Sequence, residues 1–164
     1  MAVTSTLTLK LSAREVQTGD LRDATADHLW QTAVAFESGT TATTADQVWT
    51  DTRSAAGAAD TIDLRGVLTN IVGTAMNFVD IVFIGIRNKS TTTGEVLSVG
   101  AGTNPFRDWF TDATDKLKIP PGGAFCWYAG TVDDATPTAG TEDIITIDPG
   151  AVTISYDIIV FGRS

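Results

Sequence analysis

Residues 77–87 read NFVDIVFIGIR and carry the strongest strand signal in the chain. β-Branched and aromatic residues dominate the stretch, and both kinds favour extended structure. A polar turn, KSTTTG at 89–94, comes next and is followed by the apolar stretch EVLSVG at 95–100. Two such strands around a short polar loop predict a β-hairpin with a loop of about six residues.

The PPGG turn at 120–123 separates the next two strand signals, KLKI at 116–119 and AFCWYAG at 124–130. Pro120 fixes its own φ and restricts Ile119 to extended geometry. The pair Pro121-Gly122 favours a type II turn, because Gly122 can adopt a positive φ without a Cβ clash. We therefore expect the turn to reverse the chain, with Leu117, Ile119 and Phe125 pointing inward.

Further strand signals lie on both sides of these segments, at intervals of about ten residues. They are TSTLTLKL at 4–11, LWQTAVAFE at 29–37, QVWTDTRS at 47–54, TIDLRG at 61–66, DIITI at 143–147 and VTISYDIIVFG at 152–162. Two segments are expected to differ: residues 20–28 as a helical turn or loop, and VLTNIVG at 67–73 as one helical turn. This pattern predicts an all-β chain, an antiparallel β-sandwich of jelly-roll type.

The N-terminal third of the chain differs from the rest. Leu7, Leu9 and Leu11 alternate with polar residues, which indicates a strand with one buried face. Polar, loop-like sequence separates this strand from the stronger signals. We expect residues 1–45 to be an N-terminal arm or peripheral segment and residues 46–164 to be the β-sandwich domain.

Composition limits the class of protein. The 164 residues include 27 threonines, which suit strand surfaces and turns. Hydrophobic residues make up 43% and charged residues 19%, values typical of a globular domain. A net charge of −9 argues against nucleic-acid and anionic-membrane partners. The single cysteine excludes an intrachain disulfide, and the alternating N-terminus does not resemble a signal peptide. Synthesis and folding in a cytoplasm are expected.

Residues for catalysis or for cofactor binding are scarce. A nucleophilic triad would need His28, the only histidine, and Cys126 lies within an apolar strand that disfavours a thiolate. One histidine and one cysteine do not make a zinc site of ordinary ligand type. The stretch VGAG at 99–102 lies between strands, with no helix after it to bind a nucleotide phosphate. We expect no enzyme activity, no catalytic residue, no cofactor and no metal site.

The acidic clusters have three possible interpretations. Carboxylates could bind calcium or form the acid pair of a glycosidase, or they could simply be solvated turn residues, the reading we prefer. The clusters are Asp20, Asp23 and Asp27; Asp108, Asp112 and Asp115; Asp133 and Asp134; and Glu142 and Asp143. None follows the ligand order of an EF-hand loop.

Large apolar side chains are the candidate binding residues. Tryptophans in strands are most often core residues or subunit-interface anchors, and exposed ones can stack on sugar rings. The alternating N-terminal strand could pair with a neighbouring subunit by β-augmentation. The predicted interface residues are Leu7, Leu9, Leu11, Trp30, Trp49 and Trp109.

The second part of the chain, about residues 60–164, resembles small β-rich virion proteins of tailed bacteriophages. The similarity lies in a long strand ending in Arg87-Asn88, a short strand ending in VGAG at Val99–Gly102, the segment Asp112–Gly123 with its PPGG turn, and a final strand, Tyr156–Gly162. The PPGG segment is the most specific of these motifs. Residues 1–45 carry no resemblance.

The resemblance implies a structural role and no catalytic residues. It suggests a capsid decoration (cement) protein on the capsid surface of a virion, made in the host cytoplasm and bound to the major capsid protein. A homotrimer is expected by analogy with the three-fold sites of shells. The alternatives are a tail- or fibre-associated protein that binds a receptor or glycan, and an enzyme that uses paired carboxylates.

Overall fold

The computed structural model describes residues 4–19, 24–41, 44–66, 68–130 and 135–164. These residues form ten β-strands and no helix. The strands are β1 (Ser5–Gln17), β2 (Ala24–Phe36), β3 (Gln47–Ala56), β4 (Asp60–Asp63), β5 (Asp80–Asn88), β6 (Leu97–Gly100), β7 (Lys116–Ile119), β8 (Ala124–Tyr128), β9 (Ile144–Asp148) and β10 (Thr153–Arg163). The all-β prediction is confirmed, and the paired strands are antiparallel.

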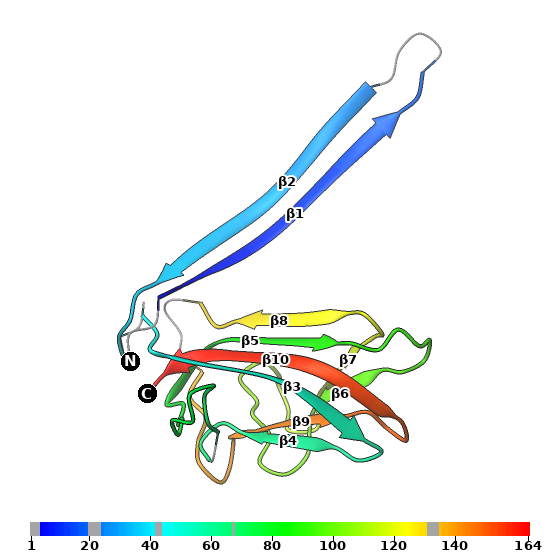
Figure 1. Ribbon diagram of the computed structural model, residues 1–164. Helices are drawn as coiled ribbons and strands as arrows, with labels where there is room; N and C mark the ends of the chain where they lie inside the picture. The colour runs from blue at the N-terminus through cyan, green and yellow to red at the C-terminus, as the bar shows by residue number, and fades with distance from the viewer. Residues whose placement is uncertain (1–3, 20–23, 42–43, 67, 131–134) are drawn as a thin grey trace.

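Strands β3 to β10 build a body of two four-stranded sheets (Figure 1). Sheet I has the order β3-β10-β5-β8, and sheet II has the order β4-β9-β6-β7. The sheets pack face to face, and the chain crosses from one sheet to the other at most of its connections. The body is therefore sandwich-like.

A single apolar core fills the space between the two sheets. Sheet I contributes the alternate residues of its central strands, among them Ile84, Ile86, Tyr156 and Ile158. Sheet II contributes Leu97 and Val99 of β6, Ile145 and Ile147 of β9, Ile62 of β4 and Ile119 of β7. These side chains are buried because successive residues of a strand point to opposite faces, so that every second one enters the core.

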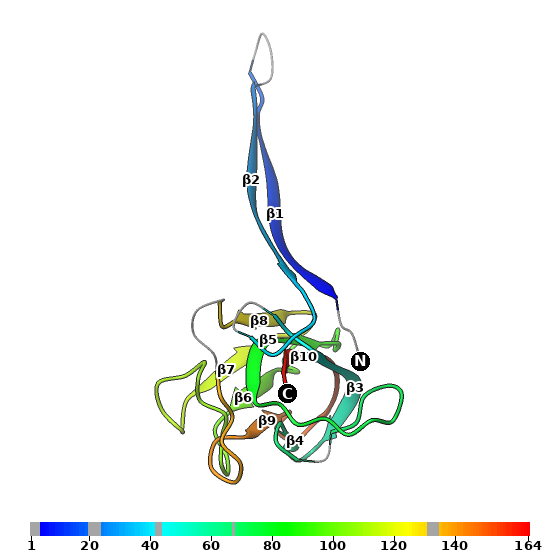
Figure 2. The same ribbon diagram turned by 90° about the vertical axis from the view of Figure 1, so that its left-hand side faces the viewer.

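The remaining two strands form a long hairpin, here called the ribbon, that extends away from the body (Figures 1 and 2). β1 and β2 pair along their whole length, from Ser5 opposite Phe36 to Gln17 opposite Ala24. At about 3.3 Å per residue, thirteen residues make a ribbon roughly 40 Å long. In both views the ribbon rises from the end of the body where the C-terminus lies.

Several local predictions were wrong. β5 and β6 do not form a hairpin, because β5 belongs to sheet I and β6 to sheet II. The PPGG turn joins β7 of sheet II to β8 of sheet I. Gly122 does adopt a positive φ, 71°, as predicted. The chain around residue 70 forms a tight turn, in which Gly73 N–H donates to the Asn70 carbonyl, between the bridged residues Thr69 and Ala75, and no helical turn.

Residues 24–28 were expected in a helical turn or loop and instead belong to β2. Residues 20–23, the rest of that predicted segment, lie outside the described residues. The Leu7 strand was expected to bury one face; in the structure, Leu7 and Leu9 are half-buried and Leu11 is exposed.

Candidate functional site

The ribbon has one apolar face and one mostly polar face. Directly paired residues of antiparallel strands project on the same side, so the register defines each face. On the apolar face, Leu7 pairs with Val34, Leu9 with Thr32, Leu11 with Trp30 and Ala13 with His28. On the polar face, Thr8 pairs with Ala33, Lys10 with Gln31, Ser12 with Leu29 and Arg14 with Asp27.

The base of the apolar face is packed on the outer face of sheet I, the face turned away from sheet II. There Phe36 is buried and makes edge-to-face contacts with Phe161 and Tyr128, at ring-centroid distances of 5.2 and 6.1 Å. Leu7 and Val34 pack against the same cluster. This contact anchors the ribbon to the body.

A β-bulge in β5 enlarges the anchoring cluster. Opposite β10 the register shifts between Phe161 and Gly162, so that Phe161 pairs with Phe83 and Gly162 pairs with Ile81. Val82 is therefore the extra residue, and it joins the outer cluster while Ile81 stays in the main core. The bulge supplies an additional apolar side chain beneath the ribbon.

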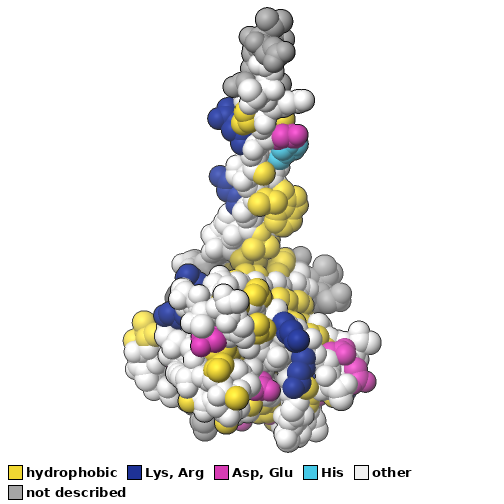
Figure 3. Space-filling model, turned by 90° about the vertical axis from the view of Figure 1, so that its right-hand side faces the viewer, with side chains coloured by type: hydrophobic (Ala, Val, Ile, Leu, Met, Phe, Trp, Pro, Cys, Tyr) yellow, Lys and Arg dark blue, Asp and Glu magenta, His cyan; other side chains and the backbone are white. Residues whose placement is uncertain are grey.

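Farther from the body the apolar face is open. The exposed fractions of Leu11 and Trp30 are 63% and 59%. In Figure 3 hydrophobic side chains run along one side of the ribbon and continue onto the body. An isolated two-stranded ribbon is at best marginally stable in water, and an exposed apolar stripe of this kind is a candidate interaction surface.

A shallow apolar groove on the outer face of sheet I lies next to the ribbon base. Its volume is about 320 Å³, and we call it the Gly85 groove. Phe83, Ile159 and Cys126 are among its lining residues, with Arg87 and Asp157 at its polar end. A smaller hollow of about 130 Å³, between Leu7, Phe36 and Val48, shares Phe83 and Ile159 with it. The two hollows therefore make one continuous apolar surface from the ribbon base across sheet I.

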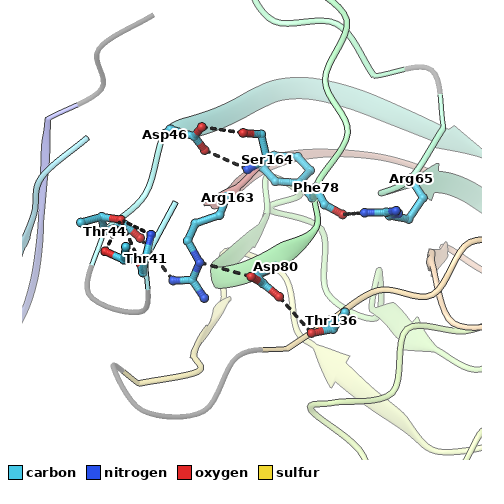
Figure 4. A network of polar contacts seen from close by, with 9 residues as sticks. All are labelled: Thr41, Thr44, Asp46, Arg65, Phe78, Asp80, Thr136, Arg163 and Ser164. Atoms are coloured by element: carbon cyan, nitrogen blue, oxygen red, sulfur yellow. Dashed lines mark hydrogen bonds and ion pairs between the residues drawn. The ribbon is translucent and has the colours of Figure 1, made fainter. Parts of the chain in front are cut away.

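A polar network holds the C-terminal residues Arg163 and Ser164 at the ribbon base (Figure 4). The guanidinium of Arg163 is buried; its Nε lies 3.3 Å from Asp80 Oδ2 and its Nη1 donates to the Thr44 carbonyl at 3.2 Å. Ser164 donates to Asp46 from its backbone N–H, at 2.9 Å, and from its hydroxyl, at 2.6 Å. The network ties the loop after β2 to the end of β10, so it fixes where the ribbon leaves the body.

A second polar cluster, partly buried, links the two sheets and is structural. Arg53 donates to both carboxylate oxygens of Asp60, at 2.7 and 2.8 Å, and the Tyr156 hydroxyl donates to Asp60 at 2.7 Å. Hydrogen bonds from Arg53 hold the pKa of Asp60 below its usual value, and burial raises the pKa of the Tyr156 hydroxyl. Asp60 thus links the guanidinium of Arg53 to the hydroxyl of Tyr156 in one hydrogen-bonded cluster.

The predicted interface residues have different environments. Leu7, Leu9, Leu11 and Trp30 share the apolar face of the ribbon. Trp49 is 4% exposed and belongs to the core between the sheets, so it offers no exposed indole to a partner. Trp109 is half-buried: its ring packs against Phe125 and Trp127, and its Nε1–H donates to the Phe106 carbonyl at 2.9 Å.

The acidic clusters are engaged in local contacts. Asp112 accepts from the backbone and hydroxyl of Thr114, Asp115 accepts from the backbone of Asp112, and Asp143 accepts from the backbone of Gly140. Asp27 forms an ion pair with Arg14 across the ribbon at 3.2 Å. Asp20, Asp23, Asp133 and Asp134 lie outside the described residues. Among the residues that are described, no three metal-ligating side chains come together.

His28 and Cys126 lie on different parts of the molecule. His28 is on the ribbon, with Nε2 3.7 Å from Glu15, and Cys126 is on β8 in the body. Partial burial raises the pKa of the Cys126 thiol, which disfavours the thiolate as predicted.

The sequence predicted only part of the apolar surface that the ribbon and the Gly85 groove form. Residues 24–36 alternate Ala26, His28, Trp30, Thr32, Val34 and Phe36 on one face. That period was visible, but polar residues interrupt it. Gly85 and Ile159 had no signal of their own, because only the pairing of β5 with β10 and β8 brings the groove together.

Comparisons with protein-family models, with curated proteins and with solved structures found no match for this chain. Within the described ranges, no helix has the length and apolar character needed to cross a membrane.

Proposed function

We propose that this chain is a non-enzymatic structural protein of a phage virion, a capsid decoration protein that binds the major capsid protein and stabilises the head. The observation that carries the proposal is the amphipathic ribbon, whose exposed Leu11 and Trp30 have no covering element among the described residues. A protein that remains alone in solution gains nothing from such a face, whereas one that assembles buries it.

The architecture of the body supports the proposal. With β3 to β10 taken as eight successive strands, the first, eighth, third and sixth form sheet I, and the second, seventh, fourth and fifth form sheet II. We infer from this order a jelly roll, an architecture frequent in viral capsid domains. Residues 1–45, which include the ribbon, are then an N-terminal arm on a β-sandwich domain of residues 46–164.

The physical properties of the chain suit assembly without cofactors. The net charge of −9 keeps free copies soluble, and buried contacts such as Arg163 with Asp80 hold the fold without a disulfide. We further propose a homotrimer, made in the host cytoplasm and carried on the capsid surface, with no nucleic-acid or membrane partner.

A receptor- or glycan-binding tail or fibre protein is the second candidate. The exposed indole of Trp30 favours it, because exposed aromatic rings can stack on sugars. The neighbours of Trp30 on its face are Leu9, Leu11, Ala13, Thr32 and His28, a mostly apolar set with few of the polar groups that orient a sugar. The decoration role therefore stands first.

Gold-labelled antibody on purified virions in the electron microscope tests the proposal. We expect label over the whole head. Label at a single vertex would replace the decoration role with the tail or fibre role. Virions that carry no label, from cells that express the protein, would overturn both.

A further inference from the structure

Two apolar surfaces of the same chain are only partly covered by contacts within the chain. The ribbon's apolar face is buried at Phe36 and exposed at Leu11 and Trp30. The outer face of sheet I is covered beneath the ribbon base, at Val82 and Phe161, and open over the Gly85 groove, where Ile159 is 39% exposed. Each surface is thus continuous with a contact that already exists.

The contact at the ribbon base shows which side chains pack on these surfaces. Leu7, Val34 and Phe36 from the ribbon pack on Phe83, Tyr128 and Phe161 from sheet I. The unused parts have the same chemistry: leucine and tryptophan on the ribbon, phenylalanine and isoleucine on the sheet. They do not meet within one chain, because the ribbon rises away from sheet I beyond its base (Figure 1).

We propose that the apolar face of the ribbon of one copy binds the Gly85 groove of a second copy of this chain. The inference rests on the proposed role as a homo-oligomeric structural protein and deepens it by naming both halves of the contact. Each copy donates one ribbon and offers one groove, so copies arranged in a ring leave neither surface unused.

Gly85 is the residue that opens the groove. Its φ is not among the positive values, so the backbone does not require glycine there. A Cβ at this position would lie 3.0 Å from Ile159 Cγ2 and 3.1 Å from Phe83 Cε1. Glycine inside a central strand weakens the strand, and it often marks a close approach of another group. The indole of Trp30 is the largest exposed side chain of the ribbon's apolar face and the natural group to fill this hollow.

Charge favours a second copy as the occupant. Free copies repel one another through their net charge of −9, but the two ribbon strands carry two basic residues, Lys10 and Arg14, and two acidic ones, Glu15 and Asp27. The two ribbon strands therefore carry no net charge. At the groove, Asp157 is paired with Lys89 at 3.1 Å, and Arg87 adds a positive charge. Glu15, on the apolar face of the ribbon and 75% exposed, is the complementary charge.

The native Cys126 in the groove provides the test. One copy carries Leu11→Cys with Cys126→Ser, so its only thiol is on the ribbon's apolar face. The second copy is the native chain with a size tag, so its only thiol is in the groove. The two are mixed, allowed to exchange and treated with a short bismaleimide. We expect a cross-linked product that contains one copy of each.

Two controls accompany this experiment. Lys10→Cys with Cys126→Ser places the thiol on the opposite face and should give no mixed product. Adding Trp30→Ser to the ribbon copy should lower the yield of mixed product at least about tenfold, because an aromatic anchor contributes more than about 1.4 kcal/mol. All substituted side chains on the ribbon are exposed or on its polar face, so folding is preserved and is checked by circular dichroism.

Three results would overturn the inference. Equal yields of mixed product from the Leu11→Cys and Lys10→Cys copies would show that the cross-link forms by random collision. Cross-linking between two ribbon copies alone would show that ribbons pair with each other. An internal cross-link in Leu11→Cys that keeps Cys126 would show that the ribbon closes on its own sheet. If virions are labelled over the head but no mixed product forms, this contact fails and the decoration role stands.

Discussion

At the scale of single residues, Gly122 shows how turn chemistry directs this fold. Its φ is 71°, and a Cβ there would meet no atom within 4 Å. The cost of a side chain is therefore purely one of backbone conformation. We expect Gly122→Val to lower the free energy of unfolding by about 1–3 kcal/mol, and Gly122→Asn to lower it less, because asparagine tolerates positive φ.

Denaturant unfolding of the three proteins measures this difference. Equal midpoints for the native chain and Gly122→Val would show that the turn does not need its glycine.

Asp60 provides a second residue-scale prediction. Hydrogen bonds from Arg53, followed by the one from Tyr156, outweigh burial and hold the pKa of Asp60 below its usual value. A carboxyl group whose pKa is lower in the folded state stabilises the fold above its unfolded pKa of about 3.9, and this stabilisation is lost as the pH falls through the folded pKa. Asp60→Asn should therefore be less stable than the native chain at pH 7 and should lose less stability below about pH 4.

The free energy of unfolding of the native chain and of Asp60→Asn, measured from pH 7 to pH 2, gives the slope of stability against pH for each protein. Asp51→Asn is the matched control, because Asp51 lies 3.5 Å from the same guanidinium and is more exposed. Equal loss of stability with falling pH in Asp60→Asn and Asp51→Asn would show that Asp60 has no special role in this cluster.

Residues with a purely local role were predictable. Gly122 follows from its Pro-Gly pair, and the alternation of Leu7, Leu9 and Leu11 follows from strand period alone. Trp49 was not, since nothing in QVWTDTRS shows which face of β3 turns inward. The side chain is buried because Trp49 pairs with Val160, another residue of the core.

At the scale of elements, strand existence was predictable and strand pairing was not. The apolar pattern located all ten strands at least in part, but it suggested that neighbours in sequence pair with each other. In the body, the pairs join distant segments, such as β3 with β10 and β4 with β9. Turn residues specify that a chain reverses, and they do not specify whether the next strand returns beside the last one or in the facing sheet.

The ribbon is the exception, because its two strands are neighbours in sequence and pair directly. It was nevertheless predicted only in part. Residues 12–28 are polar and mixed, so they lack the apolar alternation that a buried strand shows. A strand that projects into solvent has no core to pack against. Its alternation of apolar and polar residues weakens toward the tip for that reason.

The ribbon also explains why some interface residues could be predicted. Leucines that alternate cleanly along a strand require an apolar partner. Among the described residues, that partner is provided only at the base, by Phe161 and its neighbours. The acceptor groove depends on three strands from distant parts of the sequence, β5, β8 and β10, and could be recognised only in the folded chain.

At the scale of the whole molecule, the body and the ribbon differ in how their apolar side chains are covered. The body is stabilised by its own core and by buried polar groups, and the ribbon extends an apolar face beyond it (Figure 3). The network around Arg163 and Asp46 fixes the base of the ribbon to the body. A rigidly anchored, exposed apolar face is the feature on which the proposed assembly role depends.

If the ribbon's apolar face joins copies of the chain, removing its exposed side chains should lower the molar mass that light scattering measures. Three proteins are compared: the native chain, Leu11→Ser with Trp30→Ser on the apolar face, and Lys10→Ser with Leu29→Ser on the opposite face. Leu29 is 66% exposed, so the two double variants remove similar exposed surface. Their thermal unfolding should match, because none of the four side chains is part of the core.

We expect the native chain and the Lys10 and Leu29 variant to have about three times the chain mass of 17.3 kDa. The Leu11 and Trp30 variant should have the mass of one folded chain, because each lost apolar anchor weakens the contact by about 2 kcal/mol or more. A native chain that is monomeric at all concentrations, or an apolar-face variant that keeps the full oligomer mass, would contradict the account.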